Sequence, residues 1–271
     1  MVETDSLPTK RVIDSSITAL CLHEHIKTIL NWAVARQSRI VCVANVHMVM
    51  EAYWHPDFKQ ILNRADLATP DGAPLVWIMR LLGSHQQERV AGLDILAGVC
   101  ELAQATNVSL FFVGSQPEIL SRMRTRLEKE YPNLKIAAME PLPFPQLTIE
   151  EDTALTKKIN DSGAGLVLVS LGCPKQEKWM ALHRGKINAV MIGLGGAFPV
   201  YAGLQRRAPR FIQNIGLEWL YRLLQEPRRL WKRYLVTIPP FIFLAIKQLL
   251  SSQIFSTPFH IRERYLGWKV E

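Results

Sequence analysis

The chain has 271 residues, of which 48% are apolar and 21% are charged. That composition suffices for one large domain, or for one domain with an appendage, and it excludes a mainly disordered chain. The four cysteines form no C-x-x-C pair and match no zinc-binding spacing, so we expect reduced thiols and no metal site. The polar N-terminus lacks the apolar core of a signal peptide, which predicts a cytoplasmic protein.

The net charge of +8 is concentrated in one part of the chain. Residues 1–204 hold 20 Lys and Arg against 20 Asp and Glu, whereas residues 205–271 hold 12 against 4. Such asymmetry predicts a polyanionic partner, either a nucleic acid or an anionic membrane surface. The basic residues are interleaved with large aliphatic side chains that a nucleic acid would not bury, so we favour the membrane and expect no nucleic acid.

Short β-branched runs alternate with helical patterns along the first 200 residues. Strands are predicted over residues 39–45, 65–70, 108–114, 134–140, 164–172 and 188–195. Helices are predicted over residues 23–36, 46–62, 73–83, 94–105, 117–130, 149–162 and 175–184. This alternation predicts an α/β fold with a Rossmann-like, mainly parallel sheet and helices on both faces. We assign residues 1–205 to this α/β domain and residues 206–271 to a basic helical C-terminal appendage.

Ligands of such sheets bind beyond the carboxyl ends of the strands. The residues at those ends are small, polar or charged: Asn45, 69–72, Gly114, 172–177 and 193–196. Helix capping alone would account for Asn45 and for Asp71. Two such residues on successive strand ends, one of them followed by Gly72, nevertheless indicate a pocket.

The residues that follow the later strands fit either a structural role or a ligand-binding role. Ser115 fits the start of a helix, which leaves Gly114 as the residue near a ligand. Lys175 and Gln176 lie in a first helical turn, where the helix dipole disfavours a cation, so we expect them to bind a sugar or a phosphate. The 193–196 run permits close approach of a phosphate but equally fits a tight turn, and its spacing is not that of a dinucleotide site.

The appendage reads as two helices, one over 216–225 and a second that begins at Pro227. Arg222, Arg229 and Arg233 would share a stripe across that junction. The apolar stretch 235–246 is shorter than the ~20 residues of a membrane span and contains two prolines, so we expect it not to cross a membrane as a plain helix. It is expected to lie in the membrane interface or, alternatively, to pack on the domain as core.

A set of ordered motifs now resembles one known family. The segments are VANVH (43–47), TPDG (69–72), RVAGLD (89–94), FVG (112–114), LGCPKQE (171–177), GLGGAF (193–198), RAP (207–209), GLEWLYRL (216–223) and EPRR (226–229). In this order they resemble the WecG/TagA/CpsF glycosyltransferases, glycosyltransferase family 26. The resemblance spans about residues 40–234.

The resemblance implies an inverting hexosyltransferase of cell-surface polysaccharide biosynthesis. It would move an N-acetylmannosamine-type sugar from a UDP-sugar substrate to polyprenyl-diphosphate-linked N-acetylglucosamine, as a peripheral protein on the inner face of the cell membrane. The sequence has no paired-carboxylate motif for Mg²⁺, so we expect arginine to balance the charge of the leaving group and no metal or other cofactor to take part. Asp71 matches the proposed general base, and Asn45 and Gln176 match pocket positions. Appendage arginines, chiefly Arg222 and Arg229, would reach over the site. The other expected donor-binding residues are Thr69, Gly72, Asp94, Gly114, Lys175, Glu177, Gly193, Gly195 and Gly196. Diphosphate or membrane contacts are expected from Arg207, Arg228, Arg233 and Trp231.

Two departures from the family pattern leave the donor sugar open. Many members have Asp where this chain has Pro199, and many have Thr where it has Val43. Two other functions stay as alternatives. A nucleotide-binding oxidoreductase would need a dinucleotide fingerprint, and a non-catalytic membrane scaffold would bind lipid without turnover. The oligomeric state is open, a homo-oligomer included.

Overall fold

The computed structural model describes residues 7–142 and 147–256. Its centre is a six-stranded parallel sheet with the strand order β4-β3-β8-β7-β5-β6. The strands are β3 (Arg39–Ala44), β4 (Leu67–Pro70), β5 (Leu110–Gly114), β6 (Ile136–Glu140), β7 (Leu166–Ser170) and β8 (Val190–Gly193). All six were predicted from the sequence, and the predicted α/β class is confirmed.

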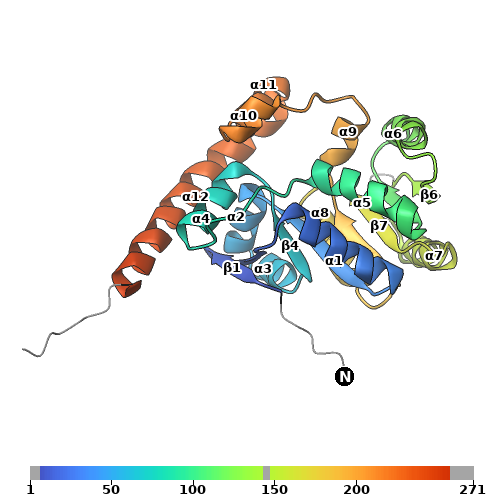
Figure 1. Cartoon of the computed structure of the whole chain (residues 1–271), viewed down its shortest axis with the longest axis horizontal. Helices are drawn as coiled ribbons and strands as arrows, with labels where there is room; N and C mark the ends of the chain where they lie inside the picture. Colours follow the sequence, from blue (N-terminus) through green and yellow to red (C-terminus); the bar gives the residue numbers. More distant parts are fainter. Residues whose placement is uncertain (1–6, 143–146, 257–271) are drawn as a thin grey trace, which may run out of the picture.

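Helices cover both faces of this sheet (Figure 1). Alternate strand residues feed two separate cores: Val41 and Val43 face one side, whereas Ile40 and Cys42 face the other. The first core is closed by α1 (Leu22–Val34), α5 (Gly92–Thr106), α6 (Pro117–Glu130) and α9 (Ala197–Tyr201). The second is closed by α2 (Val46–Trp54), α3 (Pro56–Asn63), α4 (Ala73–Leu81), α7 (Ile149–Asp161) and α8 (Lys175–His183). Burial on both sides explains why the strands are almost continuously apolar.

Two features of the first 65 residues differ from the sequence-based prediction. The single helix expected over 46–62 is two helices, because Pro56 disfavours helical backbone at His55, which is extended with ψ of 101°. An additional hairpin, β1 (Thr9–Val12) and β2 (Ser15–Thr18), forms a separate antiparallel sheet. Its strands are only four residues long, too short for a clear alternating pattern, but they bury Val12 and Ile17 in the second core.

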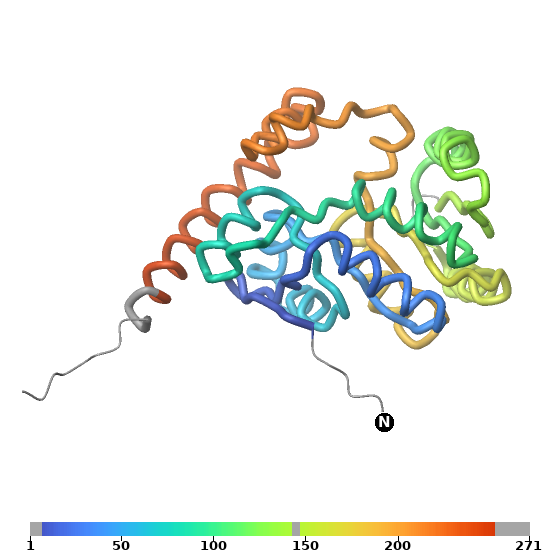
Figure 2. The backbone as a smooth tube through the Cα atoms, viewed as in Figure 1, coloured from blue at the N-terminus to red at the C-terminus, as the bar shows by residue number. Residues whose placement is uncertain are grey.

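The C-terminal part forms three helices, α10 (Arg210–Asn214), α11 (Glu218–Gln225) and α12 (Pro227–Ser256). The chain leaves α9, crosses to α10 and α11, and then returns along the domain as α12 (Figure 2). Helix α12 packs on α2 and contributes Phe241 and Ala245 to the second core. The predicted helix start at Pro227 is confirmed, and the domain boundary at residue 205 stays a prediction. Residues 257–271 of the predicted appendage lie outside the described residues.

The two prolines do not end the helix, because α12 continues through Pro239 and Pro240. The expectation that this stretch does not cross a membrane stays a prediction. Each proline removes one backbone N–H, and the carbonyls that lose a partner belong to Leu235 and Val236. Those two residues are exposed, so their carbonyls can be hydrated, and buried Phe241 anchors the helix beyond the prolines. In the described part of the chain, α12 is the one helix long and apolar enough to cross a membrane by length and composition alone.

Candidate active site

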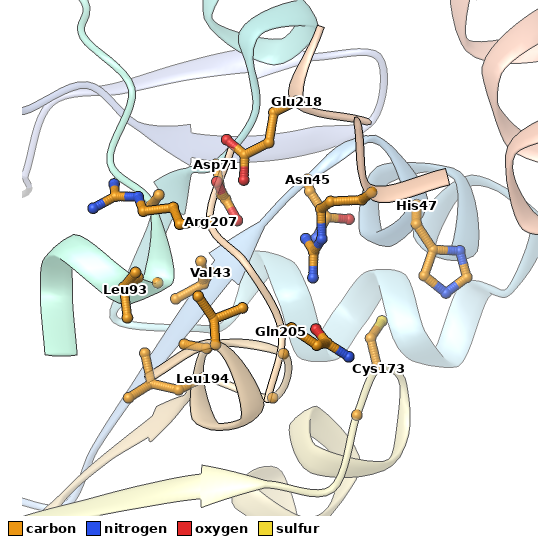
Figure 3. Close-up of a pocket in the computed structure, with 18 of the residues that line it drawn as sticks. Val43, Asn45, His47, Asp71, Leu93, Cys173, Leu194, Gln205, Arg207 and Glu218 are labelled. Carbon is orange, nitrogen blue, oxygen red and sulfur yellow. The ribbon is translucent and has the colours of Figure 1, made fainter. Parts of the chain in front are cut away.

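A cleft with a volume of about 190 Å³ lies at the carboxyl ends of β4, β3, β8 and β7. These strand ends supply Asn45, Asp71, Gln176 and the glycines 193, 195 and 196. Helix α11 and the first turns of α12 supply the facing wall, including Arg222, Arg229 and Arg233. The structure therefore brings most of the predicted polar residues together, from both sides of the predicted boundary. Figure 3 shows Asn45 and Asp71 in this cleft.

Asp71 is placed by the end of β4. Its backbone N–H donates to the carbonyl of Ala44 at 2.7 Å, which extends the pairing with β3 by one residue. Gly72, at φ of 100°, is the N-cap of α4, and no side chain caps that helix. The capping alternative for Asp71 is therefore wrong, and its carboxyl group is left to face the cleft. Asn45 does cap α2, where its Oδ1 accepts from Met48 N at 3.1 Å, and it also lines the cleft.

The cleft raises the pKa of Asp71 to about 6, chiefly because burial disfavours the charged carboxylate. The negative charge of Glu218 raises the pKa further, whereas Arg89 and Arg222 lower it. Figure 3 shows the carboxyl groups of Asp71 and Glu218 side by side. At neutral pH Asp71 is mostly ionised, yet it is a stronger base than an ordinary aspartate, which suits general base catalysis.

Six arginines surround the cleft: Arg89, Arg206, Arg207, Arg222, Arg229 and Arg233. Several of them are held by acids: Arg89 pairs with Glu218, Arg229 with Glu226, and Arg207 with Asp94 at 2.5 Å. Among the described residues Arg222 and Arg233 form no ion pair. This excess of positive charge suits a ligand with two phosphates.

Arg222 and Arg233 are positioned by close packing. A Cβ atom on Gly196 would lie 2.9 Å from Nη2 of Arg222, so the glycine makes room for the guanidinium group over the strand ends. Burial lowers the pKa of Arg233, and the nearby charge of Arg229 lowers it further. A bound anion would relieve that repulsion between cations.

Gln176 ties the α8 end of the cleft together. Its Oε1 accepts from Gly172 N at 3.2 Å, and its Nε2 donates to Glu177 Oε1 at 2.7 Å. Glu177 is fully buried beneath it, and burial raises the pKa of that carboxyl. Gln176 therefore faces the cleft, whereas Glu177 supports it from below.

Other predicted site residues do not line the cleft. Thr69 is buried, with its hydroxyl donating to Val90 O at 3.3 Å. Gly114 ends β5, where a Cβ would lie 2.6 Å from Ser170 O, which is a packing reason for glycine. Arg228 and Trp231 are exposed on α12. The remaining predicted residues outside the cleft lining are Gly72, Asp94, Lys175 and Glu177. Ligand contacts by all of these residues stay predictions.

Several cleft residues were not predicted from the sequence. Arg89 and Glu218 flank Asp71. In the sequence, Arg89 stands out only as part of a family motif, and Glu218 only as an acidic residue in a predicted helix. His47 also lines the cleft, where burial and the charge of Arg233 lower its pKa to about 4, so the ring is neutral at pH 7. Val43 lines the floor, whereas Pro199 lies in α9 outside the lining.

Residues 10–254 match the family model described as glycosyl transferase WecG/TagA/CpsF. The chain belongs to this family. It is similar to an N-acetylglucosaminyldiphosphoundecaprenol N-acetyl-beta-D-mannosaminyltransferase of Bacillus spizizenii, with 30% identity over 87% of this chain and 88% of the relative. A protein of the same name from Bacillus subtilis is 30% identical over 80% of this chain and 82% of the relative.

Membership confirms the resemblance noted in the motifs and makes the chain a glycosyltransferase of the hexosyltransferase class. It decides against the oxidoreductase and scaffold alternatives. The cleft described above combines the carboxyl group of Asp71, whose pKa is raised, with several arginines.

Proposed function

We propose that this glycosyltransferase moves N-acetylmannosamine from a UDP-sugar to N-acetylglucosamine linked by diphosphate to a polyprenol, with inversion at the anomeric carbon. The names of the two Bacillus relatives support the acceptor and the transferred sugar. The observation that carries the proposal is the placement of Asp71 at the floor of an arginine-lined cleft.

The reaction needs one proton acceptor and one stabilised leaving group. Asp71 takes the proton from the acceptor hydroxyl while the hydroxyl oxygen forms its bond to C1 of the donor sugar. The bond from C1 to the UDP oxygen breaks, and its electron pair leaves on the diphosphate. Attack from the face opposite UDP inverts the configuration at C1, which agrees with the β-linked product in the relatives' names.

Arg222 neutralises the charge of the leaving UDP diphosphate in this account. It is free of ion pairs within the described chain and lies against Gly196 at the strand ends, and guanidinium groups bind phosphate oxygens in a bidentate manner. The described residues contain no group of three or more His, Cys, Asp or Glu side chains arranged to hold a metal ion. Catalysis without a divalent metal is part of the proposal because arginine can offset the charge of the leaving group.

The exposed face of α12 supports a peripheral site on the membrane. Trp231, Leu235, Phe243 and Leu250 are each about half exposed or more on that helix, beside several arginines and lysines. The helix is also held along the domain, because Gln248 donates to Arg11 O at 2.9 Å and accepts from Ile13 N at 2.7 Å. These contacts favour a helix that lies on the inner membrane surface over one that crosses it.

A donor panel tests the proposed function. Purified full-length enzyme in detergent would be given UDP-N-acetylmannosamine, UDP-N-acetylglucosamine or UDP-glucose, with prenyl-diphosphate-linked N-acetylglucosamine as acceptor. We expect transfer from UDP-N-acetylmannosamine with a β linkage in the product. Transfer of a different sugar alone would contradict the donor assignment, and an α linkage would contradict inversion.

A further inference from the structure

A second hollow, of about 450 Å³, opens between α4 and the helices α11 and α12. We call it the α4–α12 groove. Its walls are mainly large apolar side chains, among them Trp77, Ile78 and Leu81 from α4 and Ile238, Ile242 and Ile246 from α12. These α12 residues recur at every fourth position, so they lie along one face of that helix.

The groove is continuous with the active-site cleft. Both hollows are lined by Asp71, by Glu218 and by four arginines, Arg89, Arg222, Arg229 and Arg233. The groove therefore has a cationic inner end beside the catalytic base and an apolar remainder that leads away along α12. An occupant that matches both parts has an anionic head and a long apolar chain.

The groove wall also contains large apolar side chains that are exposed to solvent and have no role in the reaction chemistry. Trp77 and Leu81 are exposed by 45% and 67%, which is unusual for such large side chains on a helix that faces another helix. Ile242 and Ile246 across the groove are 51% and 52% exposed. Facing apolar surfaces left open to water are a signature of a ligand site.

We propose that the α4–α12 groove binds the first isoprene units of the acceptor's lipid chain, with the acceptor's own diphosphate held at Arg229 and Arg233. The inference rests on the proposed function. It adds a role for the chain, because apolar burial in the groove fixes how far the head group reaches into the cleft. This burial places the sugar hydroxyl next to Asp71. An acceptor that lacks the apolar chain is not held at this depth in the cleft.

Two acceptors separate this inference from the proposed function. One is N-acetylglucosamine diphosphate with a polyprenyl chain, and the other carries an ethyl group that cannot reach the apolar part of the groove. The variants are Ile238→Trp on α12 and, on the opposite wall, Ile78→Trp, and both fill the groove. Val34→Trp on the exposed end of α1 is the matched control. All assays use full-length enzyme in detergent micelles, so membrane docking does not contribute.

We expect each groove variant to raise the KM for the polyprenyl acceptor about tenfold or more. In these variants the KM for the sugar donor and the kcat/KM for the ethyl acceptor should change less than twofold. Val34→Trp should change none of the three constants. Equal loss with both acceptors, or no loss with either in a variant whose circular dichroism is native, would overturn the groove assignment. A dimer that dissociates on Ile238→Trp would instead assign the groove to a second copy of the chain. Absence of transfer by the unmodified enzyme to either acceptor would refute the proposed function itself.

Discussion

The carboxyl groups of Asp71 and Glu218 lie side by side in the cleft, although one follows β4 and the other begins α11 (Figure 3). Glu218 is also paired with Arg89, so the three groups form one electrostatic unit. Their relationship ties the basicity of Asp71 to the docking of the C-terminal helices over the sheet.

This unit predicts the pH dependence of turnover. With the pKa of Asp71 raised to about 6, kcat/KM should rise with pH up to about 6 and level off above it. Replacing Glu218 by Gln removes a charge that raises the pKa, so the acid limb should move to lower pH. Measured pH–rate profiles check this, with Glu118→Gln on exposed α6 as a control. A limb that stays in place in Glu218→Gln would contradict the coupling.

The arginine account predicts a marked dependence on guanidinium geometry at residue 222. We expect Arg222→Ala to lower kcat by about 10²-fold or more, as loss of a preorganised charge stabiliser does. Arg222→Lys should recover only part of this, because an ammonium group cannot form the bidentate contact. Steady-state kinetics on both variants and on Arg124→Ala, a control on α6, make the comparison. Full activity in Arg222→Ala would exclude a role in leaving-group stabilisation.

The raised pKa of Asp71 predicts that Asp71→Asn, although it lowers activity, stabilises the folded protein at high pH. A pKa raised from 3.8 to about 6 means that the folded state binds a proton more tightly than the unfolded state. The cost of ionising Asp71 is therefore absent below about pH 4, grows between pH 4 and 6, and is complete above pH 6. Asp71→Asn should raise the free energy of unfolding at pH 8 by at most about 3 kcal/mol, reduced by solvent screening. Urea unfolding at pH 8 and pH 4 should show a gain only at the higher pH.

Membrane docking through α12 predicts that charge on its exposed face weakens lipid binding. Phe243→Glu combined with Leu250→Glu should reduce sedimentation with anionic vesicles several-fold, because both side chains are exposed and outside the α4–α12 groove. Turnover of a detergent-solubilised acceptor should persist. Val34→Glu on α1 serves as the control, and unchanged vesicle binding in the double variant would place the docking surface elsewhere.

The proposal that catalysis needs no divalent metal predicts that EDTA leaves turnover within about twofold of its untreated value. The physical reason is that arginines, which stay charged at every working pH, offset the diphosphate charge. Strict dependence on added Mg²⁺ or Mn²⁺ would contradict it.

The sequence predicted the strands and the residues at their ends, because burial on both faces leaves a strong apolar pattern and the ligand edge of a parallel sheet follows from strand direction alone. It could not supply the order of strands in the sheet. Gly114 was therefore included with the site, although β5 lies beyond β7 and outside the cleft.

Tertiary packing decided the remaining differences. Glu218 meets Asp71 only because α11 docks over the sheet, where it also pairs with Arg89, and no local pattern records these contacts. Pro239 and Pro240 would break an isolated helix, but packing of Phe241 and Ala245 on the domain carries α12 through them.

The most direct test of Asp71 as the general base is single-turnover transfer by Asp71→Asn, which keeps the size of the side chain and removes its basicity. We predict a fall in the transfer rate of about 10²-fold or more, with donor affinity unchanged and the folded state at least as stable as that of the unmodified enzyme. Transfer at a near-normal rate would contradict the account.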